Sequence, residues 1–363
     1  MICCPCCGFF TIPDGDGDIC PVCFWEYDKV AHKSPDEVIG ANGVSLDTAR
    51  ENYLAFGACE ERFKTNVRRP TDEERTQRAQ SRDIIIPNET ELTVVGKFRK
   101  TIWSKFLKGV KDYELISEGD KIAVCISGGK DSMLTALCMK RLQRYSKVPF
   151  EVEFIVMDPG YNERNRQRII DNAAKLGIPI HIFDTPIFKA VDTFEQNPCY
   201  MCARMRRGWL YKHAGSLGCN KIALGHHFDD VIETILMGML YGSQVQTMMP
   251  KLHSEHFEGM ELIRPMYLVR EEDIIKWSAY NGLEFIRCAC RVTEQNVTCD
   301  TGGSKRQEIK NLLCELRKVN PGVDKNIFRS VENVNLQTII SYHRGKEYHH
   351  FLDDYEEGRS IRG

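Results

Sequence analysis

The sequence predicts an α/β protein in which a small cysteine-rich module precedes a doubly wound parallel sheet. From about residue 98 onward, short apolar runs alternate with helical segments, which is the pattern of a parallel sheet covered by helices on both faces. Residues 1–28 are instead rich in Cys, Gly and Asp, and a segment of that size needs a metal to fold. The length of 363 residues fits about two domains.

The composition is that of a globular protein and argues against a membrane-spanning or secreted one. The chain is 42% hydrophobic and 28% charged, as globular proteins are, and it has no apolar run of ~18 residues that would predict a membrane span. The first residues lack the basic and apolar regions of a signal peptide, so we expect a cytoplasmic protein with no membrane partner. The formal net charge is −2, so contacts with nucleic acid must come from local basic patches.

Cysteine is unusually abundant. Sixteen cysteines without a secretory signal favour metal sites or redox chemistry over a disulfide framework. Eleven of them cluster near the start, around residue 200 and around residue 290. The isolated ones are expected to be small buried side chains: Cys59, Cys125, Cys138, Cys219 and Cys314.

The N-terminal cysteines form two knuckles. Cys4-x-x-Cys7 and Cys20-x-x-Cys23 are separated by twelve residues, a spacing typical of a tetrahedral structural Zn²⁺ site. This predicts a zinc-ribbon-like module over residues 1–65. Cys3-x-x-Cys6 is a competing register for the first knuckle.

A linker and then the α/β domain follow the module. The segment from Asp72 to Arg82 has mixed charge and no apolar face, which predicts a linker over 66–97, a domain over 98–345 and a charged tail over 346–363. Helices are expected over 45–64, 98–113, 132–145, 163–175 and 204–217, and strands over 121–126, 152–157, 180–183 and 221–224.

The strongest chemical motif is Ser127–Gly128–Gly129–Lys130–Asp131–Ser132, which directly follows a predicted strand and opens a helix. Its two glycines let the backbone turn with positive φ and approach a ligand closely. The N–H groups of the turn and the helix N-terminus then form an anion site, to which Lys130 adds a positive charge. The motif lacks the glycine spacing of a Walker A loop. The alternative is a plain Gly–Gly turn that ends at a helix cap.

A second motif runs from Gly225 to Thr234 and reads GHHFDDVIET. It follows the fourth predicted strand, at the carboxyl edge where open α/β sheets bind ligands. Gly225, His226 and Asp230 are candidates to hold a nucleotide or its metal. Asp229 could instead cap the following helix, and the histidines could be polar loop residues. Because both motifs end parallel strands, we expect them to share one site.

A third motif, Cys199-x-x-Cys202, is half of a metal site, and Cys288 and Cys290 are available to complete it. The residues alone leave a structural zinc site, a redox pair and an iron–sulfur cluster as alternatives. A basic run follows this motif: Arg204, Arg206 and Arg207. The run could bind RNA phosphates or could be a solvated helix face.

Together the three motifs closely resemble the tRNA 2-thiocytidine synthetase family, a branch of the ATP pyrophosphatases whose pyrophosphate loop (PP-loop) matches Ser127–Ser132. The resemblance covers roughly residues 98–335 and implies a Rossmann-like PP-loop fold that thiolates a tRNA base. It implies ATP, Mg²⁺ and a 4Fe–4S cluster. The stretches that carry it are Glu118–Asp120, Ser127–Ser132, Pro198–Gly208, Ala223–Glu233, Met249–Leu252 and Ile263–Pro265.

The resemblance also assigns roles to residues. The residues expected to bind ATP are Ser127, Gly128, Gly129, Lys130, Asp131, Ser132, Gly225 and His226, with Asp158 nearby. Lys130 and Asp230 are the catalytic candidates.

The expected cluster ligands are Cys199, Cys202 and Cys290, with Cys288 as the fallback. Arg204, Arg206 and Arg207 would hold tRNA. A cytidine of the anticodon loop is the expected base, and a cysteine desulfurase or sulfide the sulfur donor. A homodimer is one possible assembly, and the sequence does not determine the oligomeric state.

The chain departs from this family in two places. The family's second C-x-x-C is replaced by Cys288–Ala289–Cys290 and an insertion that reaches Cys299, and the loop at 158–161 is shorter. The N-terminal module resembles the small cysteine-rich CPCC family, which carries no firm function.

Two rival functions remain. One is ATP-dependent amine transfer, as in lysidine synthetases or small-molecule amidating enzymes; the other is a non-catalytic, metal-dependent nucleic-acid-binding protein. The C-x-x-C before Arg204 favours thiolation over amine transfer, because amine delivery needs no thiolate-bound cluster. The intact loop at Ser127–Ser132 counts against a non-catalytic protein.

Overall fold

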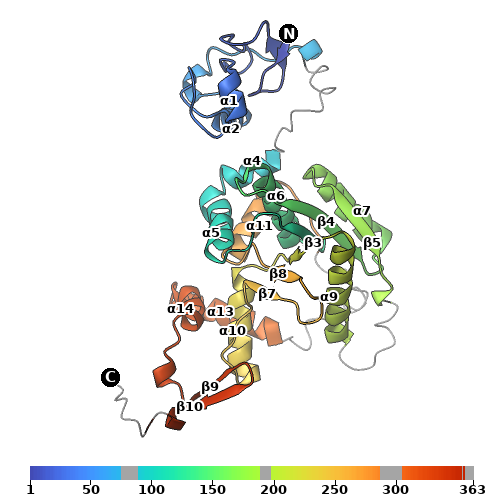
Figure 1. Ribbon diagram of the computed structural model, residues 1–363, viewed down its shortest axis with the longest axis vertical. Helices are drawn as coiled ribbons and strands as arrows, with labels where there is room; N and C mark the ends of the chain where they lie inside the picture. The colour runs from blue at the N-terminus through green and yellow to red at the C-terminus, as the bar shows by residue number, and fades with distance from the viewer. Residues whose placement is uncertain (75–88, 189–197, 287–304, 354, 356–363) are drawn as a thin grey trace.

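Figure 1 shows the computed structural model, which describes residues 1–74, 89–188, 198–286, 305–353 and 355. For residues 198–203 the description covers the backbone only. The cysteine-rich module lies at one end, the α/β domain in the middle, and a two-stranded hairpin near the C-terminus at the other end. Within the described ranges, no helix has the length and apolar character needed to cross a bilayer.

The α/β domain is built on a six-stranded sheet in the order β5-β4-β3-β6-β8-β7. Its parallel strands are β3 (Lys121–Ile126), β4 (Glu151–Asp158), β5 (Ile180–Asp184), β6 (Lys221–Ala223) and β8 (Glu261–Ile263), and β7 (Lys251–His253) pairs antiparallel with β8. The chain winds outward from β3 to β5 and then returns to β6 on the other side of β3. The predicted doubly wound sheet is therefore confirmed, with one antiparallel edge strand added.

Helices cover both faces of this sheet (Figure 1). The bounds are α6 (Lys130–Tyr145), α7 (Glu163–Lys175), α9 (Pro198–Ser216) and α11 (Glu271–Tyr280). Side chains alternate along β3, so Val124 packs in the cluster that holds α6, α7 and α11, whereas Ala123 and Cys125 pack in the cluster that holds α9. Both faces are buried, which explains why β3 is almost continuously apolar.

Three further helical segments precede β3: α4 (Glu89–Val95), the π-helix η2 (Arg99–Trp103) and α5 (Ser104–Asp112). Residues 66–97, predicted as a linker, thus include α4, whose Val94 joins the main core. The sequence did not reveal this burial, because a charged residue such as Glu91 is normally exposed. Here Glu91 of α4 is buried and forms an ion pair with Arg141 of α6, 3.1 Å away.

The C-terminal part forms a separate layer. The helices α10 (Phe228–Gly242), α13 (Lys305–Val319) and α14 (Val323–Glu332) share an apolar cluster around Phe228 and Phe328. A hairpin follows, made of β9 (Ser341–Arg344) and β10 (Glu347–His350), so part of the predicted tail is a strand. Cys314 on α13 is exposed, which corrects its expected burial, whereas the four other isolated cysteines are buried as expected.

The N-terminal module has its own small core. It comprises β1 (Ile2–Cys3), β2 (Phe10–Ile12), α1 (Lys29–Lys33), α2 (Leu46–Phe56) and the 3₁₀ turn η1 (Glu61–Phe63). Trp25 and Leu46 are fully buried in it. The helix expected over 45–64 is shorter, because Ser45 caps its start and Gly57, at φ 84°, ends it in the left-handed region.

Candidate nucleotide site and metal centre

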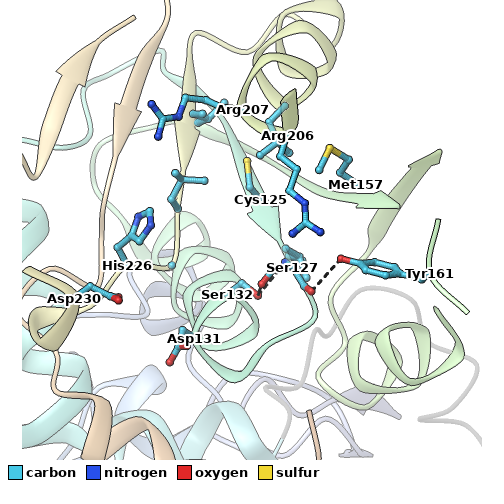
Figure 2. Close-up of a pocket in the computed structure, with 15 residues that line it drawn as sticks. Cys125, Ser127, Asp131, Ser132, Met157, Tyr161, Arg206, Arg207, His226 and Asp230 are labelled. Carbon is cyan, nitrogen blue, oxygen red and sulfur yellow. Dashed lines mark hydrogen bonds between the residues drawn. The ribbon is translucent and has the colours of Figure 1, made fainter. Parts of the chain in front are cut away.

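A cavity of about 420 Å³ opens at the carboxyl ends of β3 and β6, where the strand order reverses. This is the position at which open α/β sheets bind ligands. Its lining includes Ser127, Asp131 and Ser132 from the first motif, Gly225, His226 and Asp230 from the second, and Arg206 and Arg207 from α9. The three motifs that the sequence singled out therefore meet at one site (Figure 2).

The loop at Ser127–Ser132 owes its shape to a glycine and two hydroxyl groups. Gly128 has φ 83°, and a Cβ there would lie 2.6 Å from Ile286 and 2.7 Å from Ile169, so no larger residue fits without displacing them. The Ser132 hydroxyl accepts the Ser127 N–H at 3.1 Å and lies 3.0 Å from the Gly129 carbonyl, to which it donates. The start of α6 is thereby fixed facing the cavity.

The second motif approaches the first through Gly225. A Cβ at Gly225 would lie 2.9 Å from the backbone of Ser132, so glycine allows the two loops to touch. His227, rather than Asp229, caps α10: its Nδ1 lies 3.4 Å from the Asp230 N–H, and the Asp230 carboxylate accepts the His227 N–H at 3.0 Å. Asp230 therefore has a structural role besides facing the cavity.

His226 is held as a neutral imidazole. Burial is the main cause that lowers its pKa to about 4, and the charge of Arg264 adds to it. The Arg264 Nε–H donates to His226 Nδ1 at 3.3 Å, which places the imidazole proton on Nε2. At neutral pH this cavity residue is therefore a hydrogen-bond donor without charge.

The PP-loop lysine is anchored by an acidic residue that no motif contained. Lys130 Nζ lies 2.8 Å from Glu271 at the start of α11 and 3.2 Å from Asp131. Burial alone would lower the pKa of Lys130, but the charges of Asp131 and Glu271 outweigh it and raise the pKa, so the lysine is positive. The Glu271 carboxylate also lies 3.3 Å from Lys310 of α13.

Two arginines of α9 line the cavity opposite the loop. Figure 2 shows the Arg206 guanidinium directed toward Ser127, whereas Arg207 extends to the His226 side. Arg206 Nε is buried and has no hydrogen-bond partner within the described structure. Arg204 is exposed. An anion bound at the PP-loop would supply the hydrogen-bond partner that Arg206 Nε lacks.

Asp158, expected near the nucleotide, shapes the loop that follows β4. Its carboxylate accepts the N–H groups of Gly160 and Tyr161, at 2.8 and 2.7 Å, and pairs with Arg166 at 2.6 Å. The loop in turn brings the Tyr161 hydroxyl to the Ser127 carbonyl, 3.4 Å away (Figure 2). Asp158 thus positions a residue that lines the cavity.

Cations from α13 engage the acidic residues of the second motif. Arg317 pairs with Asp229 at 2.8 Å, and Arg306 pairs with Asp230 at 3.3 Å and with Glu233 at 2.8 Å. The C-terminal helices therefore hold α10 in place from outside the sheet. These contacts were not predicted from the sequence, because the residues of α13 do not indicate which distant helix they will contact.

The cysteines expected to hold a cluster fall largely outside the described residues. Cys199 and Cys202 lie in the first turns of α9, and their side chains are not described. Cys288, Cys290 and Cys299 lie in the range 287–304, outside the description. The backbone of α9 nevertheless places Cys202 one helical turn, and Cys199 two turns, before Arg206.

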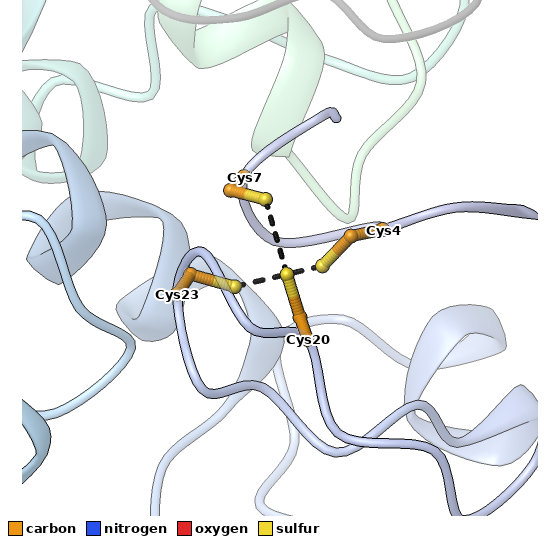
Figure 3. Close-up of side chains that lie close together, drawn as sticks. All are labelled: Cys4, Cys7, Cys20 and Cys23. Carbon is orange, nitrogen blue, oxygen red and sulfur yellow. Dashed lines mark hydrogen bonds between the residues drawn. The ribbon is translucent and has the colours of Figure 1, made fainter. Parts of the chain in front are cut away.

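The four cysteines of the N-terminal knuckles come together in one buried cluster (Figure 3). The sulfurs of Cys4 and Cys23, and those of Cys7 and Cys20, are each 3.6 Å apart, and all four lie within 4.8 Å of one another. A tetrahedral zinc–thiolate centre requires sulfurs roughly 3.8 Å apart. The cluster therefore has the donor set and spacing of a metal centre.

Known protein families match both the N-terminal module and the α/β domain of this chain. The family described as cysteine-rich CPCC matches residues 2–74, and the PP-loop domain family matches residues 99–291. A protein of Alcanivorax borkumensis named tRNA-cytidine(32) 2-sulfurtransferase is 36% identical over 250 residues, which are 67% of this chain and 84% of that protein. The protein of the same name in Vibrio campbellii is 34% identical over 258 residues, covering 69% and 82%.

The chain belongs to the tRNA-cytidine(32) 2-sulfurtransferase family of PP-loop proteins. The family predicted from the three motifs is confirmed. The U34-tRNA thiolase NcsA of Methanococcus maripaludis, solved with its [4Fe-4S] cluster, has a TM-score of 0.51 at 21% identity over 63% of this chain and 77% of that one, which supports the fold. In this chain the cysteine-rich match at residues 2–74 precedes the PP-loop match at residues 99–291.

Proposed function

We propose that this chain activates a tRNA base with ATP and then transfers sulfur to it, in the cytoplasm. The observation that carries the proposal is the cavity in which the PP-loop, a neutral histidine and the arginines of the C-x-x-C helix meet. Membership of the sulfurtransferase family supports the same reaction. The proposed substrate is a cytidine of the anticodon loop, where bases are unpaired and can be turned out.

ATP binds with its phosphates on Ser127–Ser132 and the start of α6. Backbone N–H groups at a helix N-terminus attract phosphate, and the positive Lys130 neutralises charge as pyrophosphate leaves. Asp230 is the carboxylate proposed to hold Mg²⁺ or the nucleotide. Arg206, whose Nε has no hydrogen-bond partner in the described structure, is proposed to contact a phosphate oxygen.

The reaction proceeds in two substitutions. The carbonyl oxygen of the base attacks the α-phosphorus of ATP, and the bond to pyrophosphate breaks. A sulfur nucleophile then attacks the activated carbon, and AMP leaves with the former carbonyl oxygen. His226 is a neutral donor during both steps, because Arg264 keeps its proton on Nε2.

The sulfur supply is assigned to the cysteines. We propose a 4Fe–4S cluster on Cys199, Cys202 and Cys290, with Cys288 as the alternative third ligand; three protein ligands would leave one iron free to carry sulfur. The one-turn spacing from Cys202 to Arg206 supports this assignment, since it places the cysteine end of α9 near the cavity. The donor is a cysteine desulfurase or sulfide.

The tRNA backbone is proposed to follow the arginines of α9. Arg204 and Arg207 are exposed and Arg206 reaches the cavity, so one helix presents cations from the surface to the site. A homodimer is the proposed assembly. Exposed apolar side chains near the end of α10 support it: Met239, Leu240 and Tyr241.

We propose Zn²⁺ for the N-terminal metal centre. Four buried thiols at this spacing match a closed, structural zinc site. Burial raises the pKa of the thiols of Cys4, Cys7 and Cys23, so a bound cation is needed to hold them as thiolates.

The reaction is tested anaerobically with reconstituted enzyme, ATP, Mg²⁺, sulfide and unmodified tRNA, followed by mass spectrometry of nucleosides. Wild type should release pyrophosphate and form a thionucleoside. Lys130→Ala should abolish both, whereas Cys199→Ala should retain ATP binding and lose the thionucleoside. Lys108→Ala, at an exposed lysine of α5 that pairs within its own helix, is the matched control and should behave as wild type.

If intact wild-type enzyme releases pyrophosphate but forms no thionucleoside on any tRNA, thiolation is the wrong reaction. Amine transfer would then be the better account. If no pyrophosphate is released on adding tRNA, the non-catalytic interpretation would replace both.

A further inference from the structure

We propose that the outer face of η2 and α5 binds the phosphate backbone of a double-helical arm of the tRNA substrate. The inference rests on the proposed function, because it presupposes an RNA substrate. The surface lies outside the nucleotide cavity and does not include the arginines already proposed to hold RNA. In Figure 1, α5 lies on the side of the α/β domain away from α9.

The segment from residue 92 to residue 111 contains six basic residues and no acidic one. The whole chain is nearly balanced, with 49 basic and 51 acidic residues, so this segment is a local excess of positive charge. The acidic residues nearest in sequence are Glu91, which is buried, and Asp112; Glu114 and Glu118 follow in the connection to β3. The six cations are all exposed: Lys97, Arg99, Lys100, Lys105, Lys108 and Lys111.

Helical periodicity gathers the lysines on one face. Phe98, Ile102 and Phe106 are buried in the main core, so the opposite side of η2 and α5 faces solvent over about 20 Å of helix. Lys108 on that side pairs with Asp112 of the same helix. The other four lysines form no ion pair with any described residue, and we call them the basic stripe: Lys97, Lys100, Lys105 and Lys111.

The basic stripe differs in this respect from the cations of α6. There Arg141 pairs with Glu51 and Glu91, and Lys147 pairs with Asp36, so those charges are used within the fold. In the stripe, Lys97 lies 3.6 Å from the ring centroid of Tyr280, a contact that leaves its charge in place. Like charges three or four residues apart on a helix repel each other, so a polyanion that covers the stripe would relieve this repulsion.

The chemistry of this face selects nucleic acid over a protein or a membrane. Thr101 and Ser104 are exposed between the lysines, and no large apolar side chain of η2 or α5 is exposed. Protein interfaces have an apolar or aromatic core and are depleted in lysine. A membrane-surface helix inserts its apolar face into lipid, whereas that face is buried inside the protein here. Lysines and hydroxyl groups are instead the donors that a phosphate backbone requires.

The end of the stripe lies near the edge of the sheet that carries the cavity. Gly109 in the last turn of α5 approaches the Pro265 carbonyl so closely that a Cβ there would lie 3.5 Å from it. Pro265 follows Arg264, which donates a hydrogen bond to His226 of the cavity. A base held in the cavity leaves the rest of the tRNA outside, and the stripe offers no exposed ring on which a base could stack, so a double-helical arm is its proposed ligand.

The test measures binding of unmodified tRNA to the full chain by fluorescence anisotropy, without ATP, so it is independent of the reaction. The alanine triple variant, Lys100→Ala with Lys105→Ala and Lys111→Ala, should raise the dissociation constant at least about tenfold at about 0.1 M salt. Arginine at the same three positions keeps the charge and should bind within about twofold of wild type. Circular dichroism confirms that each variant is folded.

The matched control removes the same net charge from exposed lysines elsewhere. Lys33 lies on the module, Lys318 on α13 and Lys346 in the hairpin turn, and changing all three to Ala should alter tRNA affinity less than about twofold. Salt dependence gives a second readout. The alanine triple variant should lower the slope of log Kd against log salt concentration by about 2.7, since each phosphate contact to a duplex contributes about 0.9, and the control should leave the slope unchanged.

Four results would overturn the proposal. One is an alanine triple variant that binds tRNA as wild type does, with the same salt slope. Another is an arginine triple variant that loses affinity as fully as the alanine one. The third is an equal loss in the control, which would make net charge the cause. The fourth is loss of binding to anionic phospholipid vesicles with tRNA binding unchanged, which would assign this face to a membrane surface. Stripe-dependent tRNA binding without any thionucleoside would instead refute the proposed reaction alone.

Discussion

Replacing Glu271 by Gln tests how the PP-loop lysine is positioned. Glu271 begins α11, and its two carboxylate oxygens lie 2.8 Å from Lys130 and 3.3 Å from Lys310. Gln has nearly the same shape as the neutral acid, so the variant removes a charge without creating a cavity. We expect a less stable protein in which Lys130 keeps only Asp131 as a partner, and slower release of pyrophosphate from ATP.

The magnitude follows from the pKa of Glu271. Burial would raise this pKa, but the hydrogen bond and charge of Lys130, with the charges of His227 and Lys310, together lower it from an ordinary value of 4.5 to about 2. At about 1.36 kcal/mol per pH unit, this change favours the charged carboxylate by about 3.4 kcal/mol. About a quarter of the side chain is exposed, so solvent screening reduces the expected loss to about 2 kcal/mol.

Urea unfolding of both proteins at several pH values provides the assay. Because the fold lowers the pKa of Glu271, its contribution is fully present above pH 4.5 and is lost as the pH falls toward about 2. The wild type should therefore exceed Glu271→Gln in unfolding free energy by about 2 kcal/mol at pH 7, and by less at pH 3.5. Glu272→Gln is the matched control, since among the described residues the neighbouring Glu272 forms an ion pair with Lys276 alone, on an exposed surface, and the change should cost under about 0.5 kcal/mol.

The reasoning fails if Glu271→Gln and Glu272→Gln are equally stable at pH 7, or if the difference between wild type and Glu271→Gln grows as the pH falls. Unchanged pyrophosphate release in a measurably destabilised Glu271→Gln protein would show that the residue stabilises the fold without positioning Lys130.

Four further predictions concern other parts of the chain. Gly128→Ala should lower the unfolding free energy by about 1–3 kcal/mol and reduce pyrophosphate release at least tenfold, because φ 83° and two isoleucine side chains exclude a Cβ; normal release would contradict this. Arg141→Ala should cost about 1.5–3 kcal/mol in urea unfolding, since it removes the nearest of the three cations that contact the buried Glu91 carboxylate; a loss below about 1 kcal/mol would show the pair to be dispensable. Cys20→Ser should release the proposed zinc, measured by elemental analysis, and unfold the module while the PP-loop domain stays folded; an unchanged metal content would exclude this centre. Lys33→Ala on the module should leave tRNA affinity unchanged while Arg207→Ala weakens it at least threefold, and the reverse order would place the RNA on the module.

The parts of the site that the sequence predicted are those encoded by local pattern. Ser127–Ser132 follows an unbroken apolar run, so both the strand and the position of the loop could be inferred from neighbouring residues. The short strands β7 and β8 have three residues each and carry no recognisable period, which is why they escaped prediction. The helix cap at His227 was missed because Asp and Ser are the usual caps, whereas here the imidazole takes that role.

Contacts between distant segments were beyond sequence reasoning. Arg264 was recognised only as part of a matching stretch, yet its hydrogen bond to His226, 38 residues away, determines which imidazole nitrogen of that cavity residue carries the proton. Glu271 lies 141 residues from Lys130 and begins a helix that resembles any other acidic helix start. Such pairings depend on which strand ends are neighbours in the sheet, and a single sequence gives only the strands, not their order.

The charge of the N-terminal module argues against RNA contacts on it. Residues 1–74 contain fourteen acidic and only seven basic residues, and a metal centre of four thiolates adds further negative charge. The module contacts the far end of the PP-loop helix α6 by charge, through Glu51 and Arg141 at 2.6 Å and through Asp36 and Lys147 at 3.3 Å. Because an acidic surface repels phosphates, we propose that the module supports α6 and does not bind RNA. The arginines proposed to contact RNA, Arg206 and Arg207 of α9, instead line the cavity itself.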